Sequence, residues 1–486
     1  MTPMSTPDLV RALAGHGGRR HPVAVWRLTA TATVRTPVHP GAGDSSASDA
    51  YPVELAIVRG CDGRPAVPGT TIRGLLRHHL VDRLAAFDEV EPAAVRAVFG
   101  DADDDGHQGR VCVLDAGVDC AAVGLAVRNR IDPGTGAAAR GALFDMELLP
   151  VGATFPVRIE VTVHAGDDEP ALLGAVVAAA AGLDDELGIR LGRSTGRGYG
   201  RLSTGRWRAA RWSLADTASA TVWDEHDPAG PFLDDDAATG GTPREAAAAA
   251  LGDGERDPAT MPDRRSHAVL DLALALPHGL DDQDGLDDGV GGSRQRPGTS
   301  VGGPMVAELR RALRAVADLS GDGVTARCRA DGVLRRTFGG SADDLLPSRC
   351  RVEVAAVTAG GAVSRPRVSL DQHSAAIRHL FHDAVLTDVT LRARVVVRDP
   401  APEHLAVLAL LVQAAHAGRL DFGAHTAIGY GGARLAEPAT IALVNPDDDG
   451  VPQRRVLPLD PASGTDPGGE IAGWFEALDD CLEVIR

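Results

Sequence analysis

The chain has 486 residues and a formal net charge of −18, from 49 basic and 67 acidic side chains. This length allows two to four domains of roughly 100 to 200 residues. The longest apolar stretch lies near residues 405–415, which is too short for a membrane helix of about 20 residues. Residues 1–10 lack the pattern of a secretion signal, and the six cysteines form no C-x-x-C pair. We therefore expect a cytoplasmic protein with reduced thiols.

The acidic balance argues against a nucleic-acid binder, because a basic footprint is the usual first sign of one. The acids gather in tracts such as residues 101–105, 234–236 and 447–449, so the local charge can differ from the total. Every basic side chain is arginine. GC-rich coding is the simpler explanation for the missing lysine. Either way, the only cations are planar guanidinium groups, which hold phosphate through two parallel hydrogen bonds.

Alternating and helical apolar patterns predict the elements of the first half. Arg73 and Arg77, four residues apart, share one face of a predicted helix. The predicted elements are strands at 23–35 and 53–59, a helix at 72–84, a strand at 155–164, a helix at 172–181, a glycine-rich loop at 192–200 and a strand at 201–207.

The second half follows a segment at 213–264 that is rich in Asp, Ala, Pro and Gly, a composition typical of a linker or surface insertion. Its predicted elements are a strand at 268–276, a helix at 305–317, a strand at 390–397, a helix at 403–417 and a second glycine loop at 423–431. A tail at 441–486 ends in a helix near 471–485.

Four landmarks occur twice, in the same order. Pro68-Gly-Thr-Thr returns as Pro297-Gly-Thr-Ser, Phe99-Gly as Phe338-Gly, Arg128-Asn-Arg as Arg365-Pro-Arg, and the loop from Gly192 as the loop from Gly423. The offsets between partners are 229, 239, 237 and 231 residues. Such repeated spacing indicates a duplicated domain.

The order of strands and helices predicts an α+β fold with two tandem ferredoxin-like domains. The first covers residues 20–212 and the second 265–440, with 213–264 as the linker and 441–486 as the tail. We expect the copies to superpose with Arg130 on Arg367 and Phe144 on Phe381.

The glycine loops are not triphosphate-binding loops, because those need a lysine and this chain has none. The first loop also leads into a strand, whereas a dinucleotide-binding glycine motif opens a helix. Glycines among Arg193, Arg197 and Arg201 would let the backbone approach a polyanion while guanidinium groups hold its phosphates. A tight turn with ordinary surface arginines is the simpler alternative, and the second loop carries His425 in place of the arginines of the first.

Several motifs together resemble the RAMP superfamily of CRISPR systems, and most of all the backbone subunits of type III effector complexes. They are PGTTIRGLLR, the Phe99-Gly pair with Gly109-Arg-Val, the R-x-R element running into LFDMELLPVG, and GRSTGRGYGRL. The resemblance covers nearly all of residues 23–207 and, more weakly, 268–435. It implies RRM-like folds that assemble with other subunits along a guide RNA in antiviral defence, each with a thumb hairpin that kinks the guide. It also implies a metal-dependent acid that cuts paired target RNA.

Carried over by motif, the first thumb is about residues 127–143 and the second about 364–380. The residues that the resemblance implies for RNA binding are Arg73, Arg77, Arg128, Arg130, Arg140, Arg193, Arg197, Tyr199, Arg201, Arg365, Arg367 and Arg378.

The resemblance places the cleaving acid in the loop between the first strand and the Pro-Gly turn. That loop holds Asp44, Asp49 and Glu54, and Glu54 aligns nearest to the family position. The second copy offers Asp281, Asp284 and Asp287 in its acidic loop. One or two such acids, with substrate phosphates, would hold Mg²⁺ or Mn²⁺.

Two alternatives remain open. The chain is an RNA-binding structural subunit if its loop acids are inert. It is a guide-processing endoribonuclease if a histidine acts as the general base without a metal. The histidines that such chemistry could use are His78, His79, His373, His379 and His382.

Overall fold

The chain forms two compact units, the first built mainly from residues up to Arg265 and the second mainly from Ser266 onward. Each unit combines an antiparallel sheet with helices, so the fold is α+β. Within the described residues, no helix is both long and apolar enough to cross a membrane. The computed structural model describes residues 12, 21–41, 53–88, 90–100, 108–128, 140–141, 143–225, 232–233, 237–251, 257–281, 299–319, 323–340, 346–371, 373–423, 426–464, 466 and 469–483.

The first unit is organised around β1 (Pro22–Val34), the predicted first strand. It pairs antiparallel with β7 (Thr154–His164) on one side, and with β8 (Leu202–Thr204) and β9 (Trp207–Ser213) on the other. The single strand predicted at 201–207 is therefore two short strands. Short strands β3 (Val111–Val113) and β10 (Ala238–Gly240) extend the sheet at its two sides.

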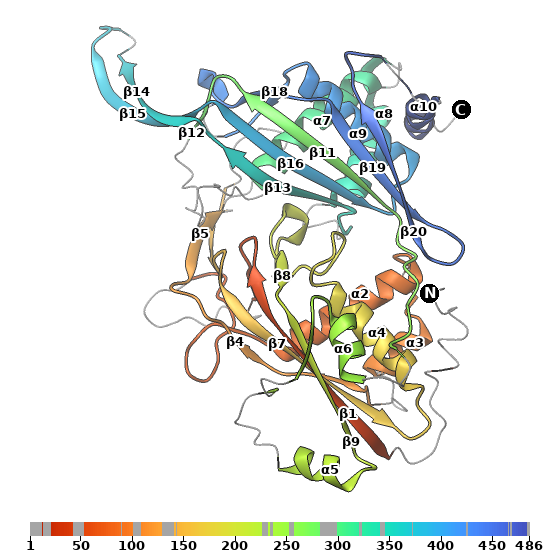
Figure 1. Cartoon of the computed structure of the whole chain (residues 1–486). Coiled ribbons are helices and arrows are strands. Elements are labelled where there is room, and N and C mark those ends of the chain that lie inside the picture. Colours follow the sequence, from red (N-terminus) through yellow and green to blue (C-terminus); the bar gives the residue numbers. More distant parts are fainter. Residues whose placement is uncertain are drawn as a thin grey trace. The chain divides into compact units, whose positions relative to one another are not determined.

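Helices cover one face of this sheet (Figure 1). The core takes alternate residues of β1, among them Trp26 and Leu28, because successive side chains of a strand point to opposite faces. Buried Leu76 and Leu172 come from the two main helices. The helices are α2 (Gly69–Ala85), α3 (Ala93–Phe99), α4 (Glu169–Ala181) and α6 (Pro243–Leu251).

A hairpin of β5 (Gly124–Arg128) and β6 (Phe144–Leu148) belongs to the first unit. The strand predicted at 53–59 does not form as such. Its residues instead make isolated bridges, including a parallel one between Leu55 and Met146 of β6. The first unit also contains the two-residue strands β2 (Ala66–Val67) and β4 (Ala116–Gly117), which pair with each other antiparallel.

The second unit is organised around β11 (His267–Leu276) in the same way. It pairs antiparallel with β16 (Val389–Arg398) on one side, and with β18 (Gly432–Leu435) and β19 (Ala439–Pro446) on the other. Further strands are β13 (Cys350–Thr358), β17 (Leu420–Asp421) and β20 (Pro452–Leu459), and the helices are α7 (Thr299–Leu319), α8 (Gly323–Phe338), α9 (Pro402–His416) and α10 (Glu470–Glu483).

The second unit also carries a long hairpin of β14 (Gly361–Leu370) and β15 (Ile377–Thr387). It extends away from the sheet as a two-stranded arm (Figure 1). Short strand β12 (Leu280–Asp281) pairs with β15 at the base of this arm.

Two segments have more structure than their composition suggests. The expected linker at 213–264 contains α5 (Thr217–Asp224), β10 and α6, and Ala246 and Ala247 of α6 are buried in the core of the first unit. The expected tail contributes β20 and α10, and Trp474 and Leu478 of α10 are buried in the core of the second unit. Both segments complete a core, and their small and apolar residues are consistent with that role.

Candidate nucleic-acid interface

The two glycine loops share several backbone features in their described residues. A short 3₁₀ turn lies in the middle of each, η1 (Thr195–Arg197) and η2 (Thr426–Ile428). The loops are closed alike, because the amide of Leu191 donates to the Gly200 carbonyl at 2.9 Å and the amide of Phe422 donates to the Gly431 carbonyl at 2.9 Å. Positive φ occurs at matching glycines, with 88°, 83° and 84° at Gly192, Gly198 and Gly200, and 95°, 93° and 79° at Gly423, Gly429 and Gly431.

The last glycine of each loop is needed for the turn itself. A Cβ on Gly200 would lie 2.3 Å from the carbonyl oxygen of Leu191, and one on Gly431 would lie 1.7 Å from that of Phe422. Neither position can hold another residue without moving the backbone. These glycines therefore shape the loops, and any contact with a polyanion falls to the flanking side chains.

In the first loop those side chains are exposed. Arg193, Arg197 and Arg201 all reach solvent. Tyr199 does not, since it is 3% exposed and packs against Met146 and Leu148 of β6. Tyr199 thus anchors the loop to the base of the hairpin, and the structure gives it no surface for stacking on a base.

The matching tyrosine of the second loop also meets its hairpin. The guanidinium of Arg365 on β14 lies 5.6 Å from the ring centre of Tyr430, a cation–π distance. Each unit therefore places its glycine loop at the base of a two-stranded hairpin.

The β14–β15 hairpin has two different faces, because directly paired residues point to the same side. Arg367 pairs with Phe381 and Arg365 with Asp383, which puts cations and an aromatic ring on one face. The opposite face is apolar and exposed, with Val368, Leu370, Ile377 and Leu380 between 45% and 67% exposed.

Within the polar face, Arg367 is held in place. It donates to the buried carboxylate of Asp383 at 3.0 and 3.3 Å, and its guanidinium lies 4.9 Å from the Phe381 ring centre. The hydrogen bonds to Asp383 raise the pKa of Arg367 above its usual value. Arg378 forms an ion pair with Asp371 near the tip. Arg365 is exposed on the same face. No carboxylate in the described part of the chain forms an ion pair with it.

The first hairpin is described only near its base. Arg128 pairs with Phe144 there, Arg140 is exposed, and Arg130 lies outside the described residues. In the second hairpin Phe381 faces Arg367. Each phenylalanine thus pairs with an arginine across its hairpin, and the expected match of Arg130 with Arg367 lies outside the described residues.

Arg73 and Arg77 are used inside the first unit. Arg73 donates from Nε to the Val111 carbonyl at 3.0 Å, and also bonds the Phe99 carbonyl. Arg77 makes two hydrogen bonds to Glu91, at 2.6 and 2.7 Å. Both guanidinium groups brace α2 against neighbouring segments, so two of the arginines expected to bind RNA already have partners within the first unit.

Among the candidate acids, Glu54 lies beside the first hairpin. Its side chain is exposed, and its backbone amide donates to Asp145 Oδ1 of β6 at 2.7 Å. Asp281 is 3% exposed, on β12. Asp44, Asp49, Asp284 and Asp287 lie outside the described residues. In the part of the chain that is described, no three His, Cys, Asp or Glu side chains gather as a metal site would require.

All five candidate histidines lie in the described part of the chain, and His373 is exposed in the turn between β14 and β15. His78 is exposed, and its Nδ1 lies 2.7 Å from the Gly74 carbonyl. His379 and His382 lie on a strand, where residues three apart point to opposite faces, so they cannot bind one ion together. His79 is 4% exposed, and burial, followed by the charge of Arg265, lowers its pKa to about 3.

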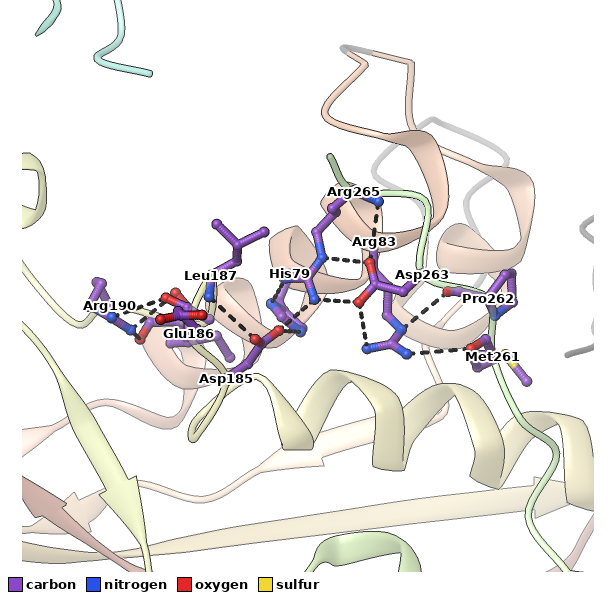
Figure 2. A network of polar contacts seen from close by, with 12 residues as sticks. His79, Arg83, Asp185, Glu186, Leu187, Arg190, Met261, Pro262, Asp263 and Arg265 are labelled. Atoms are coloured by element: carbon purple, nitrogen blue, oxygen red, sulfur yellow. Dashed lines mark hydrogen bonds and ion pairs between the residues drawn. The ribbon is translucent and has the colours of Figure 1, made fainter. Parts of the chain in front are cut away.

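His79 instead belongs to a buried network (Figure 2). Arg265 contacts Asp185 at 2.5 Å and Asp263 at 2.7 Å, and Arg83 contacts Asp263 at 3.2 Å. Burial alone would raise the pKa of both aspartates, but the neighbouring arginines lower it below the usual value. This network holds Asp263 and Arg265, at the end of the first unit, against α2.

Sequence patterns did not identify three carboxylates that contact the candidate residues. Asp145 accepts from the Glu54 amide, Glu91 from Arg77, and Asp383 from Arg367. Each lies far along the chain from its partner, or across a hairpin, where periodicity carries no information.

Residues 31–203 match the family model of the RAMP superfamily. No curated protein matches the chain. The matched residues begin in β1, end in β8, and include α2, the β5–β6 hairpin, α4 and the first glycine loop. In this region, which carries most of the first unit, the chain is similar to the RAMP superfamily.

Proposed function

We propose that the protein is a guide-RNA-binding backbone subunit of a type III CRISPR effector complex, built from two tandem ferredoxin-like RAMP domains. Its partners are the guide RNA, the target RNA and neighbouring subunits. The observation that carries the proposal is the repeated pairing of a glycine loop with an arginine-bearing hairpin, of which the first copy lies within the RAMP match.

Corresponding elements support the duplication. In each unit a central strand pairs with a strand that leads directly into an apolar helix, as β7 leads to α4 and β16 leads to α9. The Phe-Gly landmarks match as well. Phe99 ends α3 and Phe338 ends α8, and the glycines that follow have φ values of 85° and 91°.

The charge distribution supports RNA as the ligand. Arg193, Arg197, Arg201 and Arg365 are exposed near the loops and the second hairpin although the chain as a whole carries −18. Guanidinium groups bind phosphate in a sequence-independent way, and base pairing with the guide would supply specificity.

Cleavage of paired target RNA is the finer proposal. Glu54 at the base of the first hairpin is the described acid best placed for it, with Asp145 beside its backbone. Such a pair would hold Mg²⁺ or Mn²⁺ together with substrate phosphate oxygens and water. The burial of Asp281 leaves the second unit without an exposed acid among its described candidates.

The proposal is tested by expressing the full chain with its neighbouring subunits and a guide, and sequencing the RNA that copurifies. A backbone subunit should retain guide RNA of uniform length. A Glu54→Gln and Asp145→Asn double variant should keep guide and target binding but lose metal-dependent cutting, if the first unit cuts. Absence of bound guide in the wild-type complex would overturn the proposal.

A further inference from the structure

The second glycine loop borders a cavity of about 240 Å³. Its polar lining comes from His278, Asp421, Thr426, Tyr430 and Arg434, and Gly432 forms part of its wall. The volume is below the roughly 300 to 1,000 Å³ typical of pockets for drug-sized ligands. It therefore suits a small planar group better than a whole nucleotide.

A glycine keeps this cavity open. Asp421 and Gly432 pair across the second loop, as Arg190 and Arg201 do across the first. A Cβ on Gly432 would lie 3.6 Å from Asp421 Oδ1 and 3.9 Å from His278 Cδ2, both ordinary contact distances. The backbone would accept a larger residue there. Gly432 has no side chain to occupy this volume, whereas the matching position of the first unit holds Arg201.

The groups around the cavity are chemically complementary to one nucleobase. A carboxylate such as Asp421 accepts two hydrogen bonds, and a guanidinium such as Arg434 donates them. Guanine offers adjacent N1–H and N2–H donors on one edge and the O6 and N7 acceptors on another. Adenine and cytosine place an acceptor next to their amino group, and uracil has a single ring N–H between two carbonyls. Only guanine presents paired donors to a carboxylate.

The cavity also adjoins the surface proposed for RNA. Tyr430 lines the cavity, and the guanidinium of Arg365 on the hairpin lies 5.6 Å from the centre of the Tyr430 ring. Unpaired bases are commonly bound by stacking on aromatic rings or guanidinium planes while their edges are hydrogen-bonded. An RNA strand that follows the hairpin would therefore pass the mouth of this pocket.

We infer that this pocket binds one unpaired guanine base of the RNA, with Asp421 reading its N1–H and N2–H edge and Arg434 its acceptor edge. This inference rests on the proposed RNA-binding function and adds a base preference to it. The first unit lacks the pocket residues, because Arg190 and Arg201 replace Asp421 and Gly432.

The test measures binding of the full chain to short oligouridines that carry one central guanosine, adenosine, cytidine or inosine, by fluorescence anisotropy at fixed salt. The guanosine strand should bind about tenfold more tightly than the adenosine and cytidine strands, in the range of one bidentate base contact. Inosine, which lacks the 2-amino group, should lose most of that advantage.

Two variants locate the effect. Gly432→Leu fills the cavity, and Asp421→Asn removes the paired acceptor without changing the shape, so it serves even where Gly432→Leu fails to fold. Each should abolish the guanosine preference and leave oligouridine binding unchanged. Gly303→Leu, on the exposed side of α7 with free space around it, and Asp449→Asn, an exposed aspartate, are the matched controls.

Equal affinity for all four strands, or a guanosine preference that survives Asp421→Asn, would overturn the pocket assignment and leave the proposed RNA binding intact. Failure to bind any of the strands at low salt would count against RNA binding itself.

Discussion

At the residue scale, the buried ion pairs of Arg265 with Asp185 and Asp263 are expected to stabilise the first unit. The Arg265 side chain is 3% exposed and contacts two aspartates. Removing one partner of a buried ion pair costs about 3 to 5 kcal/mol, because a charge remains buried without compensation. An exposed pair such as Arg392 with Glu437 contributes far less.

We therefore predict that Arg265→Gln lowers the free energy of unfolding by about 3 kcal/mol or more. Arg392→Gln should change it by less than about 1 kcal/mol. Chemical denaturation of both variants and the wild type measures the difference. Similar effects for the two substitutions would show that the network is not stabilising.

His79 gives a second prediction at this scale. Its pKa is about 3 in the fold and 6.5 ordinarily, so the unfolded chain takes up a proton between these values that the folded chain does not. Its contribution to stability is present above pH 6.5 and is lost as the pH falls toward 3. The slope is up to about 1.4 kcal/mol per pH unit.

The stability of a His79→Gln variant should accordingly depend less on pH between 6.5 and 4.5 than that of the wild type. His78→Gln is the matched control, since the adjacent His78 is exposed. Denaturation midpoints at several pH values give the slopes. If both variants keep the wild-type slope, His79 does not titrate on unfolding.

At the element scale, the glycine loops depend on backbone conformations that other residues avoid. Gly431 has a φ of 79°, and its missing Cβ leaves room for the Phe422 carbonyl. We predict that Gly431→Ala destabilises the second unit by roughly 1 to 3 kcal/mol and weakens RNA binding. Gly117→Ala, which meets nothing within 4 Å, is the control. Wild-type thermal stability in Gly431→Ala would show that the loop can rearrange freely.

Helices and strands could be predicted from the sequence where a single hydrophobic period, alternating or helical, dominates a segment. The alternation in β1 and β7 and the apolar runs of α4 and α9 reflect burial against one sheet, so residues near in sequence carry the signal. Other elements have weaker local signals. In α8 the buried residues Ala330, Val333 and Leu334 have helical spacing, but the surrounding arginines make the local signal weak. Residues 53–59 instead make isolated bridges, one of which joins Leu55 to Met146 of β6, far along the chain.

The candidate site was predictable in outline only. Repeated landmarks located the glycine loops, because such turns need glycine at fixed steps, and the family resemblance indicated a hairpin at each R-x-R element. They did not reveal that Arg73, Arg77 and Arg367 are engaged by internal carbonyls and carboxylates, since those contacts are set by tertiary packing.

The hairpin gives its own prediction. Arg365→Gln should weaken RNA binding and reduce the magnitude of the salt slope by about 0.7, the value of one single-strand phosphate contact. Arg454→Gln, an exposed arginine on β20, is the control. An unchanged affinity and slope in Arg365→Gln would place the RNA elsewhere.

At the scale of the whole molecule, an acidic protein is proposed to bind RNA through local clusters of arginine. A net charge of −18 opposes RNA at long range, but screening limits this repulsion to about 8 Å at physiological ionic strength. Contacts at the loops and the hairpin can then dominate.

The most direct test is the affinity of the full chain for single-stranded guide RNA over a range of salt concentrations. We predict that log K falls linearly with log[salt], with a slope of about −0.7 for each phosphate contacted. Substituting Arg193, Arg197 and Arg365 together by Gln should make the slope shallower by about 2. An affinity that does not depend on salt, or no binding at low salt, would show that these arginines do not bind RNA phosphates.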